Sequence, residues 1–213
     1  MLYLAKRARP DILAATHFLS TRVQKPTQAD AEKAYHRLRY LNGTKDLGIR
    51  LNAFDPTHVI QYIDAAHAVH DNMRSHAGFA TTLGLGVIDA GSSALNINTK
   101  SACESEYISL SDNITNAIFM RNFLIAQGYQ DHPATVMQDN EAAIKLAANG
   151  YSSALRTRHI NIRYFFVKDR IARGEIVIQY CPTKLMIADC LTKPVQGQLL
   201  LEPRDLLLGY KKA

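Results

Sequence analysis

Apolar residues recur at helical spacing in the first quarter of the chain. Pro10 suits the first turn of a helix, which should run to about Val23. Its apolar stripe is Ile12, Ala15, Leu19 and Val23. Thr27, followed by Asp30 three positions later, resembles a capping box with Asp in place of the usual Glu. A second helix should therefore begin after Thr27, carry a stripe at Ala31, Ala34, Leu38 and Leu41, and end at Asn42-Gly43.

The pattern changes near residues 51–57, and from His58 onward it alternates between strand and helix signals. We predict the order β-β-β-α-β-α-α-β-α. The predicted strands are residues 59–66, 78–88, 92–98, 134–138 and 175–181. The predicted helices are residues 101–128, 140–149, 156–173 and 184–193. This order predicts an α/β domain with five strands behind a small helical segment.

Composition restricts the class of protein. With 213 residues and 47% hydrophobic content, the chain can build one core of ordinary size. No apolar run approaches the roughly 18 residues that span a bilayer, and the first ten residues do not form a signal peptide. We therefore expect an intracellular protein, cytoplasmic or nuclear, with no membrane partner. The three cysteines lack metal-site spacing and are expected to be reduced thiols.

Positive charge is concentrated at one end. Residues 1–50 hold 10 Lys and Arg against 4 Asp and Glu, whereas the remainder holds 15 of each. The net charge of +6 permits a polyanionic partner. Arg37, Arg39 and Lys45 lie around the C-terminal half of the second predicted helix. An alternative interpretation is a solvated helix whose cations lie near its negative end.

Four acidic residues interrupt apolar surroundings in separate predicted elements. They are Asp64, Glu106, Asp139 and Asp189. Burying carboxylates is costly without compensation, so four that converge at strand ends could hold two divalent ions. Two such ions can activate a water and stabilise the leaving oxygen of a phosphodiester. Taken singly, Asp139 could equally cap the helix that follows it, and Glu106 could face solvent.

Five successive motifs carry a resemblance to a known family. They are VIQYIDAAHAVHD, NTKSACESEYISLSD, VMQDNEAAIKL, TRHINIRYFF and CPTKLMIADCLTKP. In order and spacing they resemble the ribonuclease H domain at the end of copia-type retrotransposon polyproteins. Residues 2–23 and 31–51 likewise resemble the end of that family's reverse transcriptase, its thumb and connection. The resemblance covers essentially the whole chain. It implies a reverse transcriptase remnant at 1–52, a ribonuclease H-like domain at 58–196 and a C-terminal tail at 197–213.

The resemblance implies a domain built on a five-stranded mixed sheet with flanking helices. It also implies that this domain cuts the RNA strand of an RNA–DNA hybrid. Two Mg²⁺ ions, which Mn²⁺ can replace, would be the cofactor. The family's four carboxylates match Asp64, Glu106, Asp139 and Asp189, as both metal ligands and catalytic residues. Glu104 is the alternative at the helix position, although two residues rotate it to another face.

Residues that contact nucleic acid are harder to assign from the sequence. The expected contacts are Ser111, Asn140, Arg156, Arg158, His159 and Arg163. For the basic ones, a solvated helix face is the alternative. Asn161 stands where the family usually has Asp, and the loop DAGSSALNIN lacks the basic residues often found there. These departures affect hybrid binding more than chemistry.

Two functions from different classes follow. One is a metal-dependent ribonuclease acting on RNA–DNA hybrids, which could associate with the missing polymerase part of the same polyprotein. The other is an inactive or domesticated remnant that binds nucleic acid or a partner without turnover. No polymerase activity is expected, because Met1 follows the place where the polymerase palm should lie. Residues 1–50 should then expose apolar stripes.

Overall fold

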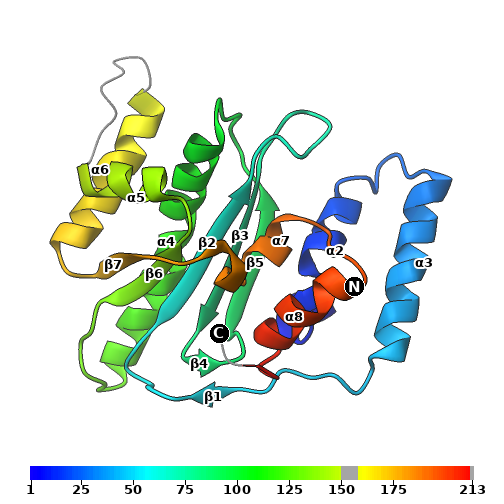
Figure 1. The fold of residues 1–213 in the computed structure, drawn as a ribbon, viewed down its shortest axis with the longest axis horizontal. Helices are drawn as coiled ribbons and strands as arrows, with labels where there is room; N and C mark the ends of the chain where they lie inside the picture. The colour runs from blue at the N-terminus through cyan, green and yellow to red at the C-terminus, as the bar shows by residue number, and fades with distance from the viewer. Residues whose placement is uncertain (150–157, 212–213) are drawn as a thin grey trace.

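A five-stranded mixed sheet forms the centre of the computed structural model, which describes residues 1–149 and 158–211 and, within these, no side chains of residues 158–161 (Figure 1). The strands lie in the order β5-β3-β2-β6-β7. Their bounds are β2 (Ile60–Ala66), β3 (His76–Thr82), β5 (Asp89–Ala94), β6 (Ala134–Gln138) and β7 (Ile176–Tyr180). The predicted five-stranded mixed sheet with flanking helices is confirmed.

Strand β2 lies at the centre, and its neighbours run in opposite senses. It pairs antiparallel with β3, where Asp64 is opposite Gly78, and parallel with β6, where Tyr62 is opposite Met137. Six of its seven residues are buried, as expected for a strand covered on both faces. Because β2 and β6 are parallel, residues at their carboxyl ends come to the same edge of the sheet.

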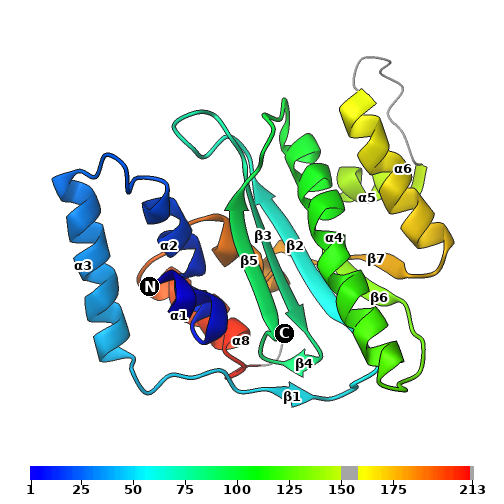
Figure 2. The ribbon, with the colours of Figure 1, turned by 180° about the vertical axis from the view of Figure 1, so that it is seen from behind.

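Three helices cover one face of the sheet, as the two opposite views show (Figures 1 and 2). They are α4 (Ala102–Ala126), α5 (Glu141–Asn149) and α6 (Arg158–Ala172). Their core packs Ile63 of β2 and Val136 of β6 against Leu110 and Ile114 of α4. This core fixes α4 along the central strand, with its N-terminal turns near the carboxyl end of β2.

The opposite face is covered by segments from both ends of the chain. They are α1 (Leu2–Arg7), the 3₁₀ helix η1 (Pro10–Ile12), α2 (Leu13–Ser20), α7 (Asp189–Thr192) and α8 (Gln198–Leu207). Leu13, Tyr62, Leu191 and Leu207 share the core on this side. The two ends of the sequence therefore build one layer of the fold.

Several predicted helix bounds change. The helix expected over residues 10–23 is η1 followed by α2 and ends at Ser20, which leaves Val23 72% exposed. The expected final helix at 184–193 is split into η2 (Thr183–Leu185) and α7. Helix α1 was not predicted. The capping box of Thr27 and Asp30 is confirmed at the start of α3 (Gln28–Gly43).

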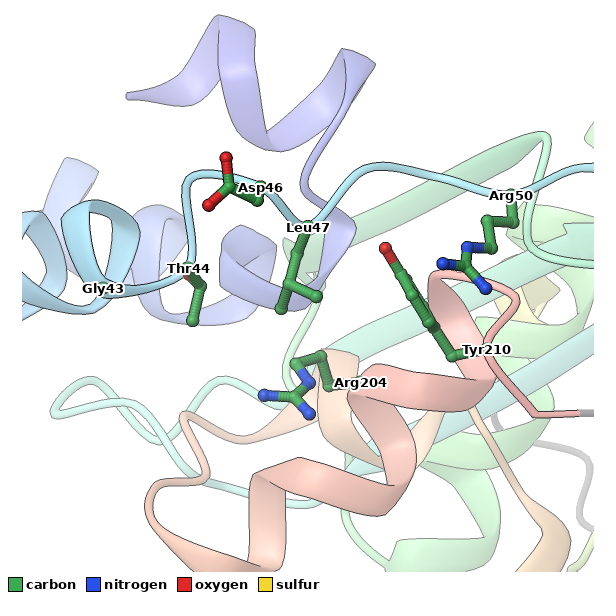
Figure 3. A pocket seen from close by; sticks show the side chains of 7 residues that line it. All are labelled: Gly43, Thr44, Asp46, Leu47, Arg50, Arg204 and Tyr210. Carbon is green, nitrogen blue, oxygen red and sulfur yellow. The ribbon is translucent and has the colours of Figure 1, made fainter.

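Residues 197–213, expected as a tail, contain α8, and the chain after α8 is tied to the linker that precedes the domain. The backbone N–H of Arg50 donates to the carbonyl of Leu208 at 2.8 Å, and its guanidinium lies 4.1 Å from the centroid of the Tyr210 ring. Gly209 has φ +76°, and a side chain there would meet the Arg50 carbonyl oxygen. Figure 3 shows the adjoining pocket, of about 460 Å³. The division into three domains stays a prediction.

A short two-stranded sheet, β1 (Asn52–Ala53) with β4 (Gly84–Leu85), connects the linker to the domain. Within the described part of the chain, no helix combines the length and apolar character needed to cross a membrane.

Candidate metal centre

Asp64 lies in the second half of β2 with its side chain on the face that α7 covers. Alternation along the strand places Ile63 in the core beneath α4 and Tyr62 in the opposite core. The Thr192 hydroxyl of α7 lies 2.9 Å from Oδ2 of Asp64, and the Ser109 hydroxyl of α4 donates to the Asp64 backbone carbonyl at 3.0 Å. Asp64 is therefore held between two helices and is only 6% exposed.

Glu106 comes from the second turn of α4, and it is also buried. The Gln138 side-chain amide donates to its Oε2 at 3.5 Å, a long hydrogen bond. The alternative Glu104 points elsewhere, since its Oε2 accepts the Lys100 backbone N–H at 2.6 Å. The structure thus brings Glu106, and not Glu104, to the centre.

Asp139 follows the last residue of β6, and the capping role left open by the sequence falls to its neighbour. The Asn140 side-chain oxygen accepts the backbone N–H groups of Ala142 and Ala143 at 3.0 and 3.1 Å, as a helix cap does. The Asp139 carboxylate accepts a hydrogen bond from the Thr183 hydroxyl at 2.9 Å. Asp139 is therefore free of the helix it precedes.

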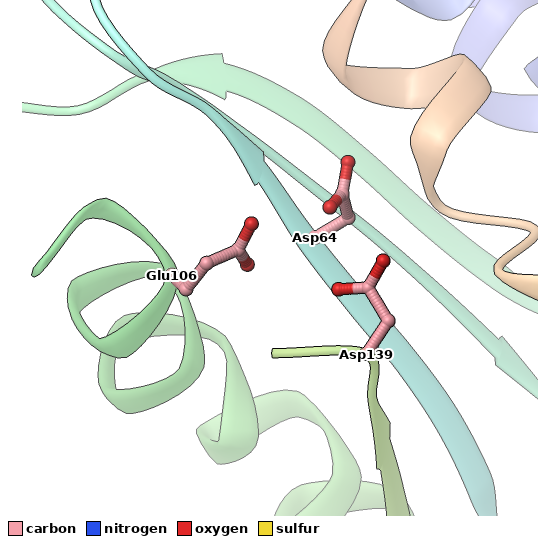
Figure 4. Close-up of side chains that lie close together, drawn as sticks. All are labelled: Asp64, Glu106 and Asp139. Carbon is pink, nitrogen blue, oxygen red and sulfur yellow. The ribbon is translucent and has the colours of Figure 1, made fainter. Parts of the chain in front are cut away.

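These three carboxylates, from β2, from α4 and from the residue after β6, point toward one another in Figure 4. One oxygen from each of Asp64, Glu106 and Asp139 lies within 4.8 Å of the others. Among the ion pairs of residues 1–149 and 158–211, none involves these three groups. Three carboxylates this close repel one another unless protons or a cation compensate.

Asp189, the fourth predicted carboxylate, lies outside this group of three. It is the first residue of α7, and its Oδ1 accepts a hydrogen bond from Nζ of Lys193 at 3.0 Å. Its side chain is 44% exposed. Its negative charge still contributes to raising the pKa of Asp64, so Asp189 flanks the cluster. The structure therefore brings three of the four predicted carboxylates together and places the fourth beside them.

Burial and mutual repulsion shift the pKa values of the two buried carboxyl groups upward. Burial, with the charges of Asp189 and Asp139, raises the pKa of Asp64 to about 6, against the lowering effect of the Thr192 hydrogen bond. Burial, with the charges of Asp64 and Asp139, raises the pKa of Glu106 to about 9. In the absence of a cation, the protein therefore holds a proton at this centre near neutral pH.

The donor set fits a divalent cation of the hard type. All three groups offer carboxylate oxygens, which are the ligands that Mg²⁺ and Mn²⁺ prefer, with no sulfur or imidazole among them. A bound cation would neutralise the repulsion that the raised pKa values express. Asp64, Glu106 and Asp139 are thus compatible with a metal site.

Relatives with curated descriptions match nearly the whole chain. The retrovirus-related Pol polyprotein from transposon TNT 1-94 of Nicotiana tabacum is 30% identical over 196 residues, which is 92% of this chain. That from transposon RE2 of Arabidopsis thaliana is 31% identical over 189 residues. The homologues of this chain are retrovirus-related Pol polyproteins of copia-type transposons. The chain spans 15% of the tobacco polyprotein and 13% of the Arabidopsis one. No family model matches the chain.

Solved structures with a similar fold include ribonuclease H domains. LC11-RNase H1, isolated from compost, aligns with a TM-score of 0.48 at 15% identity, over 63% of this chain and 92% of that one. A structure of the foamy viral protease-reverse transcriptase in complex with double-stranded DNA aligns at 0.44 and 14% identity, over 67% of this chain and 96% of that one.

The structure describes the side chains of three of the six expected nucleic-acid contacts, namely Ser111, Asn140 and Arg163. Arg156 lies outside the described residues, as do the side chains of Arg158 and His159 in α6. Nε of Arg163 donates to Oδ1 of Asp112 at 2.9 Å. Ser111 is buried in α4, with 5% exposure, which leaves it little surface for a ligand. The grouping of these six residues therefore stays a prediction.

Sequence reasoning missed the residues that hold the carboxylates in place. Thr183 and Thr192 contact Asp139 and Asp64, and Gln138 contacts Glu106. Thr192 and Lys193 belong to the quoted motif around Asp189, which was the available signal. Thr183 belongs to the same quoted motif, but its approach to Asp139 depends on how the chain turns after β7.

Proposed function

We propose that the chain is a metal-dependent endonuclease that hydrolyses the RNA strand of RNA–DNA hybrids. The observation that carries this proposal is the cluster of Asp64, Glu106 and Asp139, whose oxygens approach within 4.8 Å. The homology to Pol polyproteins of copia-type transposons supports a role in reverse transcription of such an element. An RNA–DNA hybrid is the intermediate that this process produces.

The roles of the residues follow from their positions. Asp64, Glu106 and Asp139 would hold two Mg²⁺ ions, which supply the activation of a water and stabilisation of the leaving oxygen. Thr192 and Thr183 are positioning residues, since each hydroxyl fixes one carboxylate from outside the cluster. Lys193 holds Asp189 beside the cluster.

Recognition of the hybrid requires contacts with phosphates and with the 2′-hydroxyl of the RNA strand. Arg156, Arg158, His159 and Arg163 are proposed to contact phosphates around α6. Asn140 remains a candidate through its amide nitrogen, because its oxygen caps α5. Ser111 is proposed as a further polar contact, and this residue is 5% exposed.

A second candidate function is a remnant that binds nucleic acid without turnover. The ion pair between Asp189 and Lys193 favours it, because this pair satisfies the fourth carboxylate without a metal. The two functions predict the same nucleic-acid binding and differ in cleavage.

A substrate panel tests the proposal. Purified protein in Mg²⁺ is incubated with an end-labelled RNA–DNA hybrid and, in parallel, with duplex DNA and duplex RNA. We expect cutting of the RNA strand of the hybrid alone, absent in the Asp64→Asn variant and in EDTA. A folded protein that binds the hybrid and leaves it intact would support the remnant, and cutting of duplex DNA would contradict the proposed substrate.

A further inference from the structure

A large groove lies away from the carboxylate cluster, between α2, α3 and residues 194–201. Its volume is about 1390 Å³. Residues of α2 and α3 line one side, and the other side begins at Pro194, directly after Lys193. The proposed ribonuclease activity gives this groove no role.

Arg37 of α3 lines the groove and is more than nine-tenths buried, with 8% exposure. Its Nη1 atom has no hydrogen-bond partner among the described residues, which also offer it no ion pair. A buried guanidinium is costly unless an anion and hydrogen-bond acceptors surround it. Arg37 thus has an unmet requirement for an acceptor at the wall of a groove.

Two of the three acids of the groove wall, Asp11 and Asp30, do not meet this requirement, because their oxygens are engaged elsewhere. Asp11 accepts hydrogen bonds from Arg9 and from the Tyr40 hydroxyl, at 2.7 to 2.9 Å and 2.6 Å. Asp30 forms the capping box with Thr27 and lies 3.8 Å from Arg22.

The remaining charges of the wall are mostly positive. Three basic residues of the wall form no ion pair in the described chain: Lys33, Arg37 and Arg39. Glu32 is the one acidic residue of the wall that forms none in the described chain. The groove therefore complements a ligand that carries negative charge.

The apolar residues of the groove restrict the chemical class of its ligand further. Ile12, Phe18 and Leu200 contribute to its wall, and the exposed Tyr35 and Leu201 lie on it at 66% and 38% exposure. A phosphate backbone gains little from such surface, whereas a peptide with apolar side chains buries it. Exposed aliphatic and aromatic residues around one buried Arg are typical of a protein interface.

We propose that this groove binds an acidic, apolar peptide segment of a partner protein, with a carboxylate of the segment paired to Arg37. The apolar side chains of the segment pack on Phe18, Tyr35 and Leu201, while Lys33 and Arg39 complement its remaining acids. The site is independent of the carboxylate cluster, so it can be present whether or not the chain cuts RNA.

Titration of the ¹⁵N-labelled full chain with two synthetic amphipathic peptides tests this assignment. One peptide carries leucine on one face and glutamate on the other, and its counterpart has lysine in place of every glutamate. We expect the glutamate peptide alone to shift amide signals of α2, α3 and residues 194–201. The Arg37→Met variant should weaken its binding at least about tenfold, whereas Lys25→Met, which removes an exposed charge outside the groove, should leave it unchanged.

Thermal melting separates a binding role of Arg37 from a structural one. Because Met keeps the apolar stem and removes an unpaired buried charge, Arg37→Met should melt no lower than the parent protein. The proposal is overturned by any of four results: no binding of the glutamate peptide, equal binding of the lysine peptide, unchanged binding by Arg37→Met, or a lower melting temperature of that variant. Shifts of the same signals by an RNA–DNA hybrid duplex, without a response to the peptide, would assign the groove to nucleic acid instead.

Discussion

The hydroxyl oxygen of Thr192 lies 2.9 Å from Oδ2 of Asp64, although 128 positions separate the two residues. The same oxygen lies 2.8 Å from the backbone carbonyl oxygen of Asp189. A hydroxyl has one proton to donate, so these two acceptors share it. Thr192 thus joins the central strand of the sheet to the start of α7, and its contact with Asp64 places α7 beside the carboxylate cluster.

Removing this hydroxyl should weaken metal binding. Thr192→Val keeps the shape of the side chain and deletes the donor that lowers the pKa of Asp64. Loss of such a supporting hydrogen bond typically reduces metal affinity or activity about 10-fold to 100-fold. We expect the Mg²⁺ concentration needed for half-maximal hybrid cleavage to rise by about tenfold or more. Thr192→Ser, which keeps the hydroxyl, should need the same Mg²⁺ concentration as the parent protein. An unchanged Mg²⁺ dependence of Thr192→Val would contradict the positioning role.

Gly78 permits the close packing of α7 on the sheet. It pairs with Asp64 across β2 and β3, and a Cβ atom there would lie 2.8 Å from Cβ of Leu191 and 3.0 Å from the Ala188 carbonyl oxygen. Gly78→Ala should lower the free energy of unfolding by about 1–3 kcal/mol, as overpacking of a core does. Urea denaturation measures this, with Gly48→Ala as the matched control, because nothing lies within 4 Å of its added Cβ. Equal stability of the two variants would show that α7 is free to move.

Asp139 and Asn140 should respond oppositely to substitution. Asn140→Ala removes the cap of α5 and should cost about 1 kcal/mol of stability. Asp139→Asn removes one of three mutually repelling carboxylates and should leave the metal-free protein equally stable or more so. Conversely, the rise in melting temperature on addition of Mg²⁺ should persist in Asn140→Ala and disappear in Asp139→Asn. The reverse pattern would make Asp139 the cap and remove it from the metal centre.

The metal-free protein should lose stability as the pH rises. Asp64 and Glu106 have folded-state pKa values of about 6 and about 9, above the values near 4 of unfolded carboxyl groups. The folded state therefore binds protons more tightly than the unfolded state. The stabilisation is complete below about pH 4 and is lost progressively as the pH rises to about 9, with the Asp64 contribution lost mainly below about pH 6. Urea unfolding in EDTA across this range measures the slope. Glu106→Gln should flatten its upper part, and a slope of opposite sign would contradict the raised pKa values.

The order of elements was accessible from the sequence because hydrophobic spacing reports it locally. The predicted bounds of β6, residues 134–138, coincide with those of the strand. The spacing of Thr27 and Asp30 correctly predicted the capping box. Helices α1 and α8 were missed, since their stability comes from contacts distant in the sequence. Pro203 inside α8 is a helix breaker by local rules, yet burial of Leu207 and Leu208 at its end fixes the helix against the domain.

The identity of the acidic residues at the candidate site could be predicted from the sequence, but their arrangement in space could not. Local pattern could not decide between a cap and a ligand for Asp139, and the structure resolves this by assigning the cap to Asn140. The position of Asp189 depends on the packing of the four-residue helix α7 and on Lys193, which no spacing rule describes. Thr183 and Thr192 reach the site only through tertiary contacts.

Cleavage of an RNA–DNA hybrid by the parent protein and by Asp139→Asn, in Mg²⁺ and at equal hybrid occupancy, tests the central claim most directly. We expect RNA-strand cutting by the parent protein and a rate at least about a hundredfold lower in the variant, because a metal ligand is lost. Hybrid binding should be the same for both. Equal cutting rates would contradict a catalytic metal centre at Asp64, Glu106 and Asp139, and the absence of cutting by a folded, hybrid-bound parent protein would contradict the ribonuclease itself.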